Sequence, residues 1–222
     1  REASASIRKV VAIQSFVTAH AGEYERPSTL ILMDEQARLL REACVNEQPS
    51  VCWRTSGLTP SIRLTSDLAD PSFPSYRLCL LWNAVGLTRA QADVLRSRVA
   101  AGMTLVAVGR TGICSRDFAS EDEALEALGP GVRRIADATS VTDAKLNELA
   151  RQAGARVHSE PGNVTYIGNG VACVHRIAGP VRVDFGREVT PVDPQTGKTS
   201  APVRQWCPDI PVNGLAVMTY LP

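Results

Sequence analysis

The chain has 222 residues, of which 44% are apolar and 21% charged, and its formal net charge is +1. This composition is typical of a globular protein with a core of its own, as one large domain or a medium and a small one. With no basic stripe, and no apolar run near the roughly 20 residues of a membrane span, we expect neither a nucleic-acid nor a membrane partner. The opening residues 1–6 fit neither an initiator Met nor a signal peptide, so we expect a processed chain or a fragment. The compartment stays open.

The first third of the chain contains short apolar segments. The run at residues 9–14 predicts a first buried strand. Pro27 can open a helix, and Asp34 can cap a second or continuing one. Residues at helical spacing follow on one face: Ala37, Leu40 and Cys44. Residues 61–65 alternate between apolar and polar side chains, which predicts a second strand.

The segment from 78 to 108 indicates the fold class. Residues 78–82 are apolar without alternation, which is typical of strands covered on both faces in parallel sheets. Thr88 and Gln91 have capping-box spacing and predict the start of a helix, and Gly102 is placed to end it. Residues 104–108 predict the next strand. A strand, a crossover helix and a strand predict a doubly wound, mostly parallel α/β sheet of the flavodoxin or class I amidotransferase type.

The pattern changes in the last third of the chain. Residues 120–128 predict a short acidic helix, and residues 142–153 predict a clearer one. Beyond these the helical period is lost, and short strands are separated by turns at 161–163, 168–170, 178–180 and 193–197. We therefore predict an α/β domain at 1–154 followed by a small all-β domain at 155–222.

The six cysteines, at 44, 52, 79, 114, 173 and 207, predict no metal site. None of them forms the C-x-x-C pair of common zinc sites, so we expect no metal and no cofactor. Cys79 lies inside an apolar strand and is interpreted as a small core residue. In a chain of this length six scattered cysteines do not require disulfides, and the redox state stays open.

Two short motifs are candidates for nucleophilic catalysis. Residues 109–112 follow a strand but lack a complete phosphate-loop pattern, so a tight turn is the simpler interpretation. Residues 112–114, which end at Cys114, resemble the first half of the nucleophile elbow of class I glutamine amidotransferases, although Arg116 replaces the small residue that the turn needs. His158 and Glu160 have the spacing by which such enzymes orient a general base. A Cys-dependent hydrolase using these three residues is one alternative, and a surface turn is the simpler interpretation of residues 158–160.

Carboxylates and tryptophans suggest carbohydrate chemistry. Three acidic groups could act as catalytic pairs in glycoside hydrolysis, but they also fit helix starts and turns: Asp34 with Glu35, Asp67 with Asp70, and Glu121 with Asp122 and Glu123. Trp53 and Trp206 could stack on a sugar, which makes a carbohydrate-binding module the second alternative. Trp82 ends a buried strand and His175 lies in an alternating one, so both are interpreted as structural.

Several segments together resemble the glutamine-amidotransferase-like domain and the C-terminal β domain of beta-galactosidase-like glycoside hydrolases. The resemblance covers about residues 9 to 222, and its motifs are structural. The matching segments are 65–71, 74–78, 83–84, 87–88, 102–106, 153–159, 163–166, 174–175 and 192–197. The chain departs from the family pattern at Met103, where a second glycine is common, and after Val108, where an aromatic-rich segment is missing.

The resemblance implies a non-catalytic role. In this family the hydrolytic carboxylates lie in a catalytic barrel, which this chain lacks, and the amidotransferase-like domain has usually lost its nucleophile. It serves domain packing, oligomerisation (trimers in some members) or the shaping of the substrate cleft. The implied partners are a catalytic barrel on the same or a separate chain and further copies of this chain. We expect no catalytic residue here beyond the weak candidates Cys114, His158 and Glu160.

Overall fold

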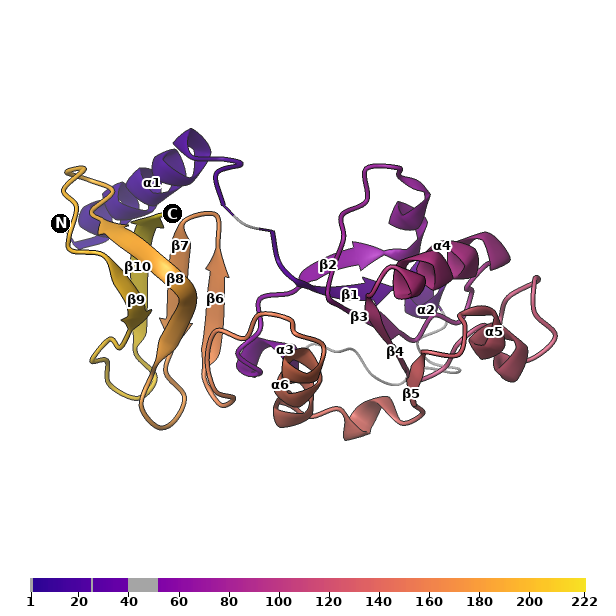
Figure 1. Ribbon diagram of the computed structural model, residues 1–222. Coiled ribbons are helices and arrows are strands. Elements are labelled where there is room, and N and C mark those ends of the chain that lie inside the picture. Colours follow the sequence, from indigo (N-terminus) through magenta and orange to yellow (C-terminus); the bar gives the residue numbers. More distant parts are fainter. Residues whose placement is uncertain (1, 25, 40–51) are drawn as a thin grey trace. The chain divides into compact units, whose positions relative to one another are not determined.

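The structure is a computed structural model that describes residues 2–24, 26–39 and 52–222. It divides into two compact units, each drawn from separate stretches of the chain (Figure 1). The first, called the parallel-sheet unit, comprises Pro27–Trp53 and Pro60–Arg156. The second, called the β unit, comprises Arg1–Arg26, Arg54–Thr59 and Val157–Pro222. The division into domains at residue 155 stays a prediction.

The parallel-sheet unit is built on five parallel strands in the order β2-β1-β3-β4-β5. Their bounds are β1 Thr29–Met33, β2 Ser61–Leu64, β3 Leu78–Trp82, β4 Thr104–Val108 and β5 Arg133–Ile135. This order is that of flavodoxin-like sheets, and it reverses direction between β1 and β3. The prediction of an α/β parallel sheet followed by a β region is confirmed.

Helices connect these strands: α2 Glu35–Leu39, α3 Cys52–Thr55, α4 Arg89–Ala100, α5 Glu121–Ala127 and α6 Asp143–Gln152, with 3₁₀ turns at Thr65–Ala69 and Ala138–Ser140. The predicted capping box of α4 is confirmed. Thr88 Oγ1 accepts from the Gln91 N–H at 3.3 Å, and Gln91 Oε1 accepts from the Thr88 N–H at 2.9 Å. Two backbone donors at the helix start are therefore satisfied locally, which begins α4 directly after β3.

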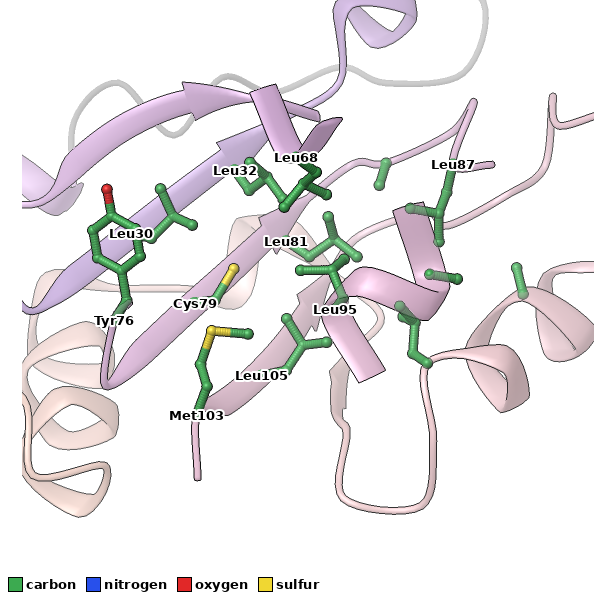
Figure 2. Packing of buried hydrophobic residues seen from close by; sticks show 14 of the residues in the cluster. Leu30, Leu32, Leu68, Tyr76, Cys79, Leu81, Leu87, Leu95, Met103 and Leu105 are labelled. Carbon is green, nitrogen blue, oxygen red and sulfur yellow. The ribbon is translucent and has the colours of Figure 1, made fainter. Parts of the chain in front are cut away.

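The core of the parallel-sheet unit lies between the sheet and α4 (Figure 2). Cys79 and Leu81 of β3 point to this side with Leu105 of β4, and they pack against Leu95 of α4. The alternate residue Leu80 is equally buried, and successive side chains of a strand point to opposite faces. Both faces of β3 are thus covered, which explains its uninterrupted apolar sequence.

The β unit is an antiparallel sheet in the order β6-β7-β10-β8-β9. Its strands are β6 Val164–Gly168, β7 Val171–His175, β8 Val183–Val192, β9 Val203–Trp206 and β10 Leu215–Leu221. The helix α1, Glu2–Ala19, belongs to the same unit. The segment after α1 is bound to the sheet, since Tyr24 Oη donates to the Tyr220 carbonyl at 2.8 Å.

Two early predictions were wrong. Residues 9–14 lie within α1, because Ile7, Val10 and Val11 recur at helical spacing in an alanine-containing stretch of 18 residues. Pro27 opens no helix, because the strand β1 follows it. Like β3, β1 has a run of apolar residues without alternation. Asp34 does cap α2, accepting from the Gln36 N–H at 2.8 Å, whereas Leu40 and Cys44 lie outside the described residues.

Candidate functional site

The carboxyl edge of the parallel sheet is where ligands bind in folds of this type, at the point where the strand order reverses. Three polar or glycine positions follow the strands there: Asp34 after β1, Asn83 after β3 and Gly109 after β4. In this chain a hydrogen bond within the protein crosses this edge. Asp34 Oδ2 accepts from the Gly86 N–H at 2.5 Å, which joins the ends of β1 and β3 across the reversal point.

The loop at residues 109–112 directs its backbone donors inward. Gly109 N–H donates to the Ile135 carbonyl at 2.8 Å, and Arg110 N–H donates to Asn83 Oδ1 at 3.1 Å. Thr111 N–H donates to Glu121 Oε1 at 2.9 Å, and Gly112 N–H to the Ala84 carbonyl at 2.8 Å. A phosphate-binding loop needs such donors aimed at the ligand. In the native chain these donors are used within the protein, as in the tight turn that the sequence favoured.

Glu121 is the most heavily engaged carboxylate at this edge. Its Oε2 lies 3.2 Å from Arg110 Nε and 3.0 Å from an Arg134 guanidinium nitrogen, while its Oε1 accepts from Thr111 N–H. The side chain is only 15% exposed. The sequence interpretation of Glu121 as a helix-start acid missed this role, because Arg134 lies on β5, a strand too charged to be recognised from its sequence.

The other predicted carboxylates have local structural partners. Burial raises the pKa of Glu35, but hydrogen bonds from Ser66 and Thr65 outweigh it and leave the pKa below its ordinary value. The Ser72 backbone likewise lowers the pKa of Asp70. A general acid in glycoside hydrolysis needs a raised pKa. These two groups therefore lack the property that the acid role requires.

Asp67 and Glu123 also serve helix starts and turns. Asp67 Oδ2 accepts from the Leu64 N–H at 3.1 Å. Hydrogen bonds from the Ala119 backbone and from Arg89 lower the pKa of Glu123. The neighbouring Asp122 is exposed, with a guanidinium nitrogen of Arg134 3.9 Å away. This is the structural interpretation that the sequence favoured.

The residues of the Cys–His–Glu alternative fall in different units. Cys114 is exposed in the parallel-sheet unit, and its N–H donates to the Val85 carbonyl at 2.8 Å. His158 is buried in the β unit, where its Nδ1 lies 3.1 Å from the Asp184 carbonyl oxygen, and Glu160 is exposed in the same unit. Their joint action stays a prediction. His175 is half-buried on β7, as its alternating sequence indicated.

The structure shows how far each tryptophan is buried. Trp206 on β9 is half-buried and packs against the core of the β unit. Trp53 is also half-buried. Trp82 is buried in β3, as expected, although its Nε1 has no hydrogen-bond partner among the described residues. Sugar binding by Trp53 or Trp206 stays a prediction.

The described parts of the chain contain no group of three or more His, Cys, Asp or Glu side chains that could hold a metal ion. Among the same residues, no helix has the length and apolar character needed to cross a bilayer. The hydrogen bonds and ion pairs at the sheet edge define the candidate site: Asp34, Asn83, Glu121 and the arginines that contact Glu121.

Cysteine reactivity should separate the core thiol from the exposed ones. Burial raises the pKa of Cys79 to about 12, so at pH 8 roughly one molecule in ten thousand carries the thiolate. We expect iodoacetamide to label Cys114 and Cys207, which are exposed, and to leave Cys79 unlabelled until urea is added. Peptide mass spectrometry measures this directly. Labelling of native Cys79 at the rate of Cys207 would contradict the assignment of Cys79 to the core.

Comparison with known proteins adds a likeness of fold. No protein-family model matches the sequence, and no curated protein does. The solved beta-galactosidase of Rahnella sp. R3 matches 99% of the chain at 12% identity, with a TM-score of 0.61. The chain shares its fold with part of beta-galactosidases. A GH42 beta-galactosidase from G. stearothermophilus matches 93% of the chain at 12% identity (TM-score 0.57), and the beta-galactosidase of Bacillus circulans sp. alkalophilus matches 87% at 13% (TM-score 0.55).

The match covers only part of each of those enzymes. The chain covers 44%, 42% and 41% of the Rahnella, G. stearothermophilus and B. circulans structures, respectively, so it spans about two fifths of their length. Both units fall within the match to the Rahnella structure, because it includes 99% of the chain. The resemblance to beta-galactosidase-like glycoside hydrolases is thereby confirmed at the level of the fold.

Proposed function

We propose that this chain is a non-catalytic accessory region of a glycoside hydrolase-like protein, serving domain packing or subunit contacts. The observation that carries the proposal is the fold likeness over 99% of the chain to a beta-galactosidase of which it covers 44%. The rest of such an enzyme, including a catalytic barrel on the same or a separate chain, would supply the hydrolytic carboxylates. Cleft shaping is a further role open to such a region.

The chemistry of the sheet edge supports a non-catalytic role. The Asp34 carboxylate bridges the reversal point, and the donors of the loop at 109–112 are used within the protein. The pKa values of Glu35 and Asp70 lie below their ordinary values, the opposite of what a general acid needs. A site so fully engaged with its own side chains suits a scaffold better than a reaction centre.

An exposed apolar stripe supports a contact role. Ile7, Val10 and Val11 lie on one face of α1 and are 62%, 63% and 54% exposed, whereas Phe16 on the opposite face is buried. Contiguous exposed apolar side chains mark interaction surfaces more often than single ones do. We therefore assign the stripe, defined as these three residues, to a contact with another subunit.

A charge placed in the stripe tests the contact. We expect the purified chain to sediment above its monomer mass of 23.9 kDa, and Val10→Asp to weaken that association at least tenfold. A carboxylate buried at an apolar interface loses its hydration without gaining a partner. Ala19→Asp, which adds the same charge at an exposed position two turns beyond the stripe on α1, is the matched control. A chain that is monomeric at every concentration would rule out self-association through α1.

Activity assays test the non-catalytic part of the proposal. We expect the isolated chain to hydrolyse neither an aryl galactoside nor glutamine. Glutamine hydrolysis abolished by Cys114→Ser would instead support the Cys-dependent alternative, and galactoside hydrolysis would overturn the accessory role. Oligosaccharide titration followed by tryptophan fluorescence addresses the carbohydrate-binding alternative, because Trp53 and Trp206 are half-buried and their emission responds to contact.

A further inference from the structure

The surroundings of Glu121 resemble an anion-binding site more than an ordinary surface ion pair. Two guanidinium groups, from Arg110 and Arg134, converge on one carboxylate oxygen at 3.2 and 3.0 Å. The other oxygen accepts from the Thr111 N–H at 2.9 Å. These three donors come from two different segments, the loop after β4 and the strand β5. Guanidinium forks and backbone N–H groups are the donors that proteins use for phosphate and sulfate.

The balance of charge and burial around the carboxylate fits the same interpretation. Both arginines are partly exposed, at 51% and 40%, whereas the Glu121 carboxylate between them is 15% exposed. Asp122 adds little compensation, since its side chain is 86% exposed and 3.9 Å from Arg134. The Thr111 hydroxyl in the same loop is fully buried and has no hydrogen-bond partner among the described residues. Glu121 therefore satisfies the Thr111 N–H and the two facing guanidinium groups, but not the Thr111 hydroxyl.

We infer that Arg110, Arg134 and the Thr111 N–H form a cradle for a small oxyanion, and that Glu121 keeps this cradle filled with an internal carboxylate. The native chain is then closed to free phosphate at the sheet edge, and removing the carboxylate opens the position. The inference is independent of the proposed accessory function. It concerns a site within the parallel-sheet unit, and its test involves neither association nor hydrolysis.

Phosphate binding by Glu121 variants tests the cradle. The probe is inorganic phosphate, titrated at constant ionic strength with chloride as the balancing anion and followed by calorimetry. We expect Glu121→Ala to bind phosphate at least tenfold more tightly than the unsubstituted chain. Adding Arg134→Gln to Glu121→Ala should return the affinity to that of the unsubstituted chain, because one of the two guanidinium donors is lost.

A matched control separates a specific site from a general change of charge. Glu126→Ala removes the same charge from the exposed side of the same helix, α5, and leaves the arginine pair intact. We expect it to bind phosphate as weakly as the unsubstituted chain does. Equal phosphate affinity of Glu121→Ala and Glu126→Ala would overturn the inference, because an ion pair with a purely structural role leaves no selective anion site behind.

A second variant covers the case in which Glu121→Ala fails to fold. Glu121→Ser keeps a polar side chain at the start of α5 but shortens it, so that the position between the two arginines opens. We expect the melting temperature of Glu121→Ser to rise with phosphate at constant ionic strength, since a ligand that binds the folded state stabilises it. A melting temperature as insensitive to phosphate as that of the unsubstituted chain would overturn the inference.

Discussion

Replacing Gly57 by alanine should cost the β unit more than about 3 kcal/mol of folding free energy, at the upper end of single substitutions. Gly57 has a φ of 79°, where a side chain alone costs about 1–2 kcal/mol. A Cβ atom there would also overlap the carbonyl oxygen of Ser159. Backbone hydrogen bonds keep the two segments together, from His158 N–H to the Gly57 carbonyl at 2.9 Å and from Gly162 N–H to the Thr55 carbonyl at 2.8 Å. The clash therefore cannot be relieved by rotating a side chain.

The matched control for this substitution is Gly197→Ala in the same unit. Gly197 has a similar φ of 70°, but nothing lies within 4 Å of the Cβ position. Gly197→Ala should therefore lower the folding free energy only by the cost of a side chain at positive φ, about 1–2 kcal/mol. Urea titration followed by circular dichroism measures both, with hydrogen exchange on β6 and β7 to assign the loss to the β unit. Equal costs for the two variants would show that the approach of Gly57 to Ser159 contributes nothing to stability.

Sequence patterns identified the elements whose signals are local. The capping box at Thr88 and Gln91 and the unalternating run at 78–82 depend on neighbouring residues only, and the structure contains both as expected. The turn-rich composition from residue 156 onward likewise predicted short strands separated by turns, and these strands form the antiparallel sheet of the β unit. Local sequence patterns were thus sufficient to predict the fold class, because doubly wound sheets repeat one simple unit of strand and helix.

The errors arose where one short signal fits two structures. Residues 9–14 are an apolar run that fits a strand, and the longer helical period of α1 decides against it. β5 was missed because two of its three residues are exposed arginines. The strand lies at an edge of the sheet and has no apolar pattern that a sequence search could detect. Its position depends on pairing with β4, which no local pattern specifies.

The candidate site shows the same limit more sharply. Glu121 was noted as an acid at a helix start, yet its partners Arg110 and Arg134 are 11 and 13 residues away in sequence and come together only through the sheet. Asn83 follows a buried strand directly, a position that could have marked it as a loop-binding side chain. Its acceptor role for the Arg110 N–H depends on the parallel pairing of β3 with β4.

Replacing Leu81 by alanine should cost the parallel-sheet unit about 3–4 kcal/mol, within the range for fully buried leucines. Leu81 lies on β3, between β1 and β4, and is completely buried in the cluster shown in Figure 2. Alanine would remove apolar contacts and leave a cavity, because strands paired on both sides cannot move inward to fill it. The substitution therefore tests the packing of β3 against α4, one of the two faces that its unbroken apolar sequence predicted to be covered.

Leu64→Ala is the matched control, with the same chemical change on the edge strand β2. Leu64 is 44% exposed, so its truncation should cost less than about 1 kcal/mol. Urea titration measures both variants, and hydrogen exchange of the peptide at 78–82 assigns the loss of Leu81→Ala to the parallel-sheet unit. A cost for Leu81→Ala as small as that for Leu64→Ala would mean that the face of β3 toward α4 is not packed as a core. Since the proposed accessory role needs this unit as a rigid scaffold, that result would also weaken the functional proposal.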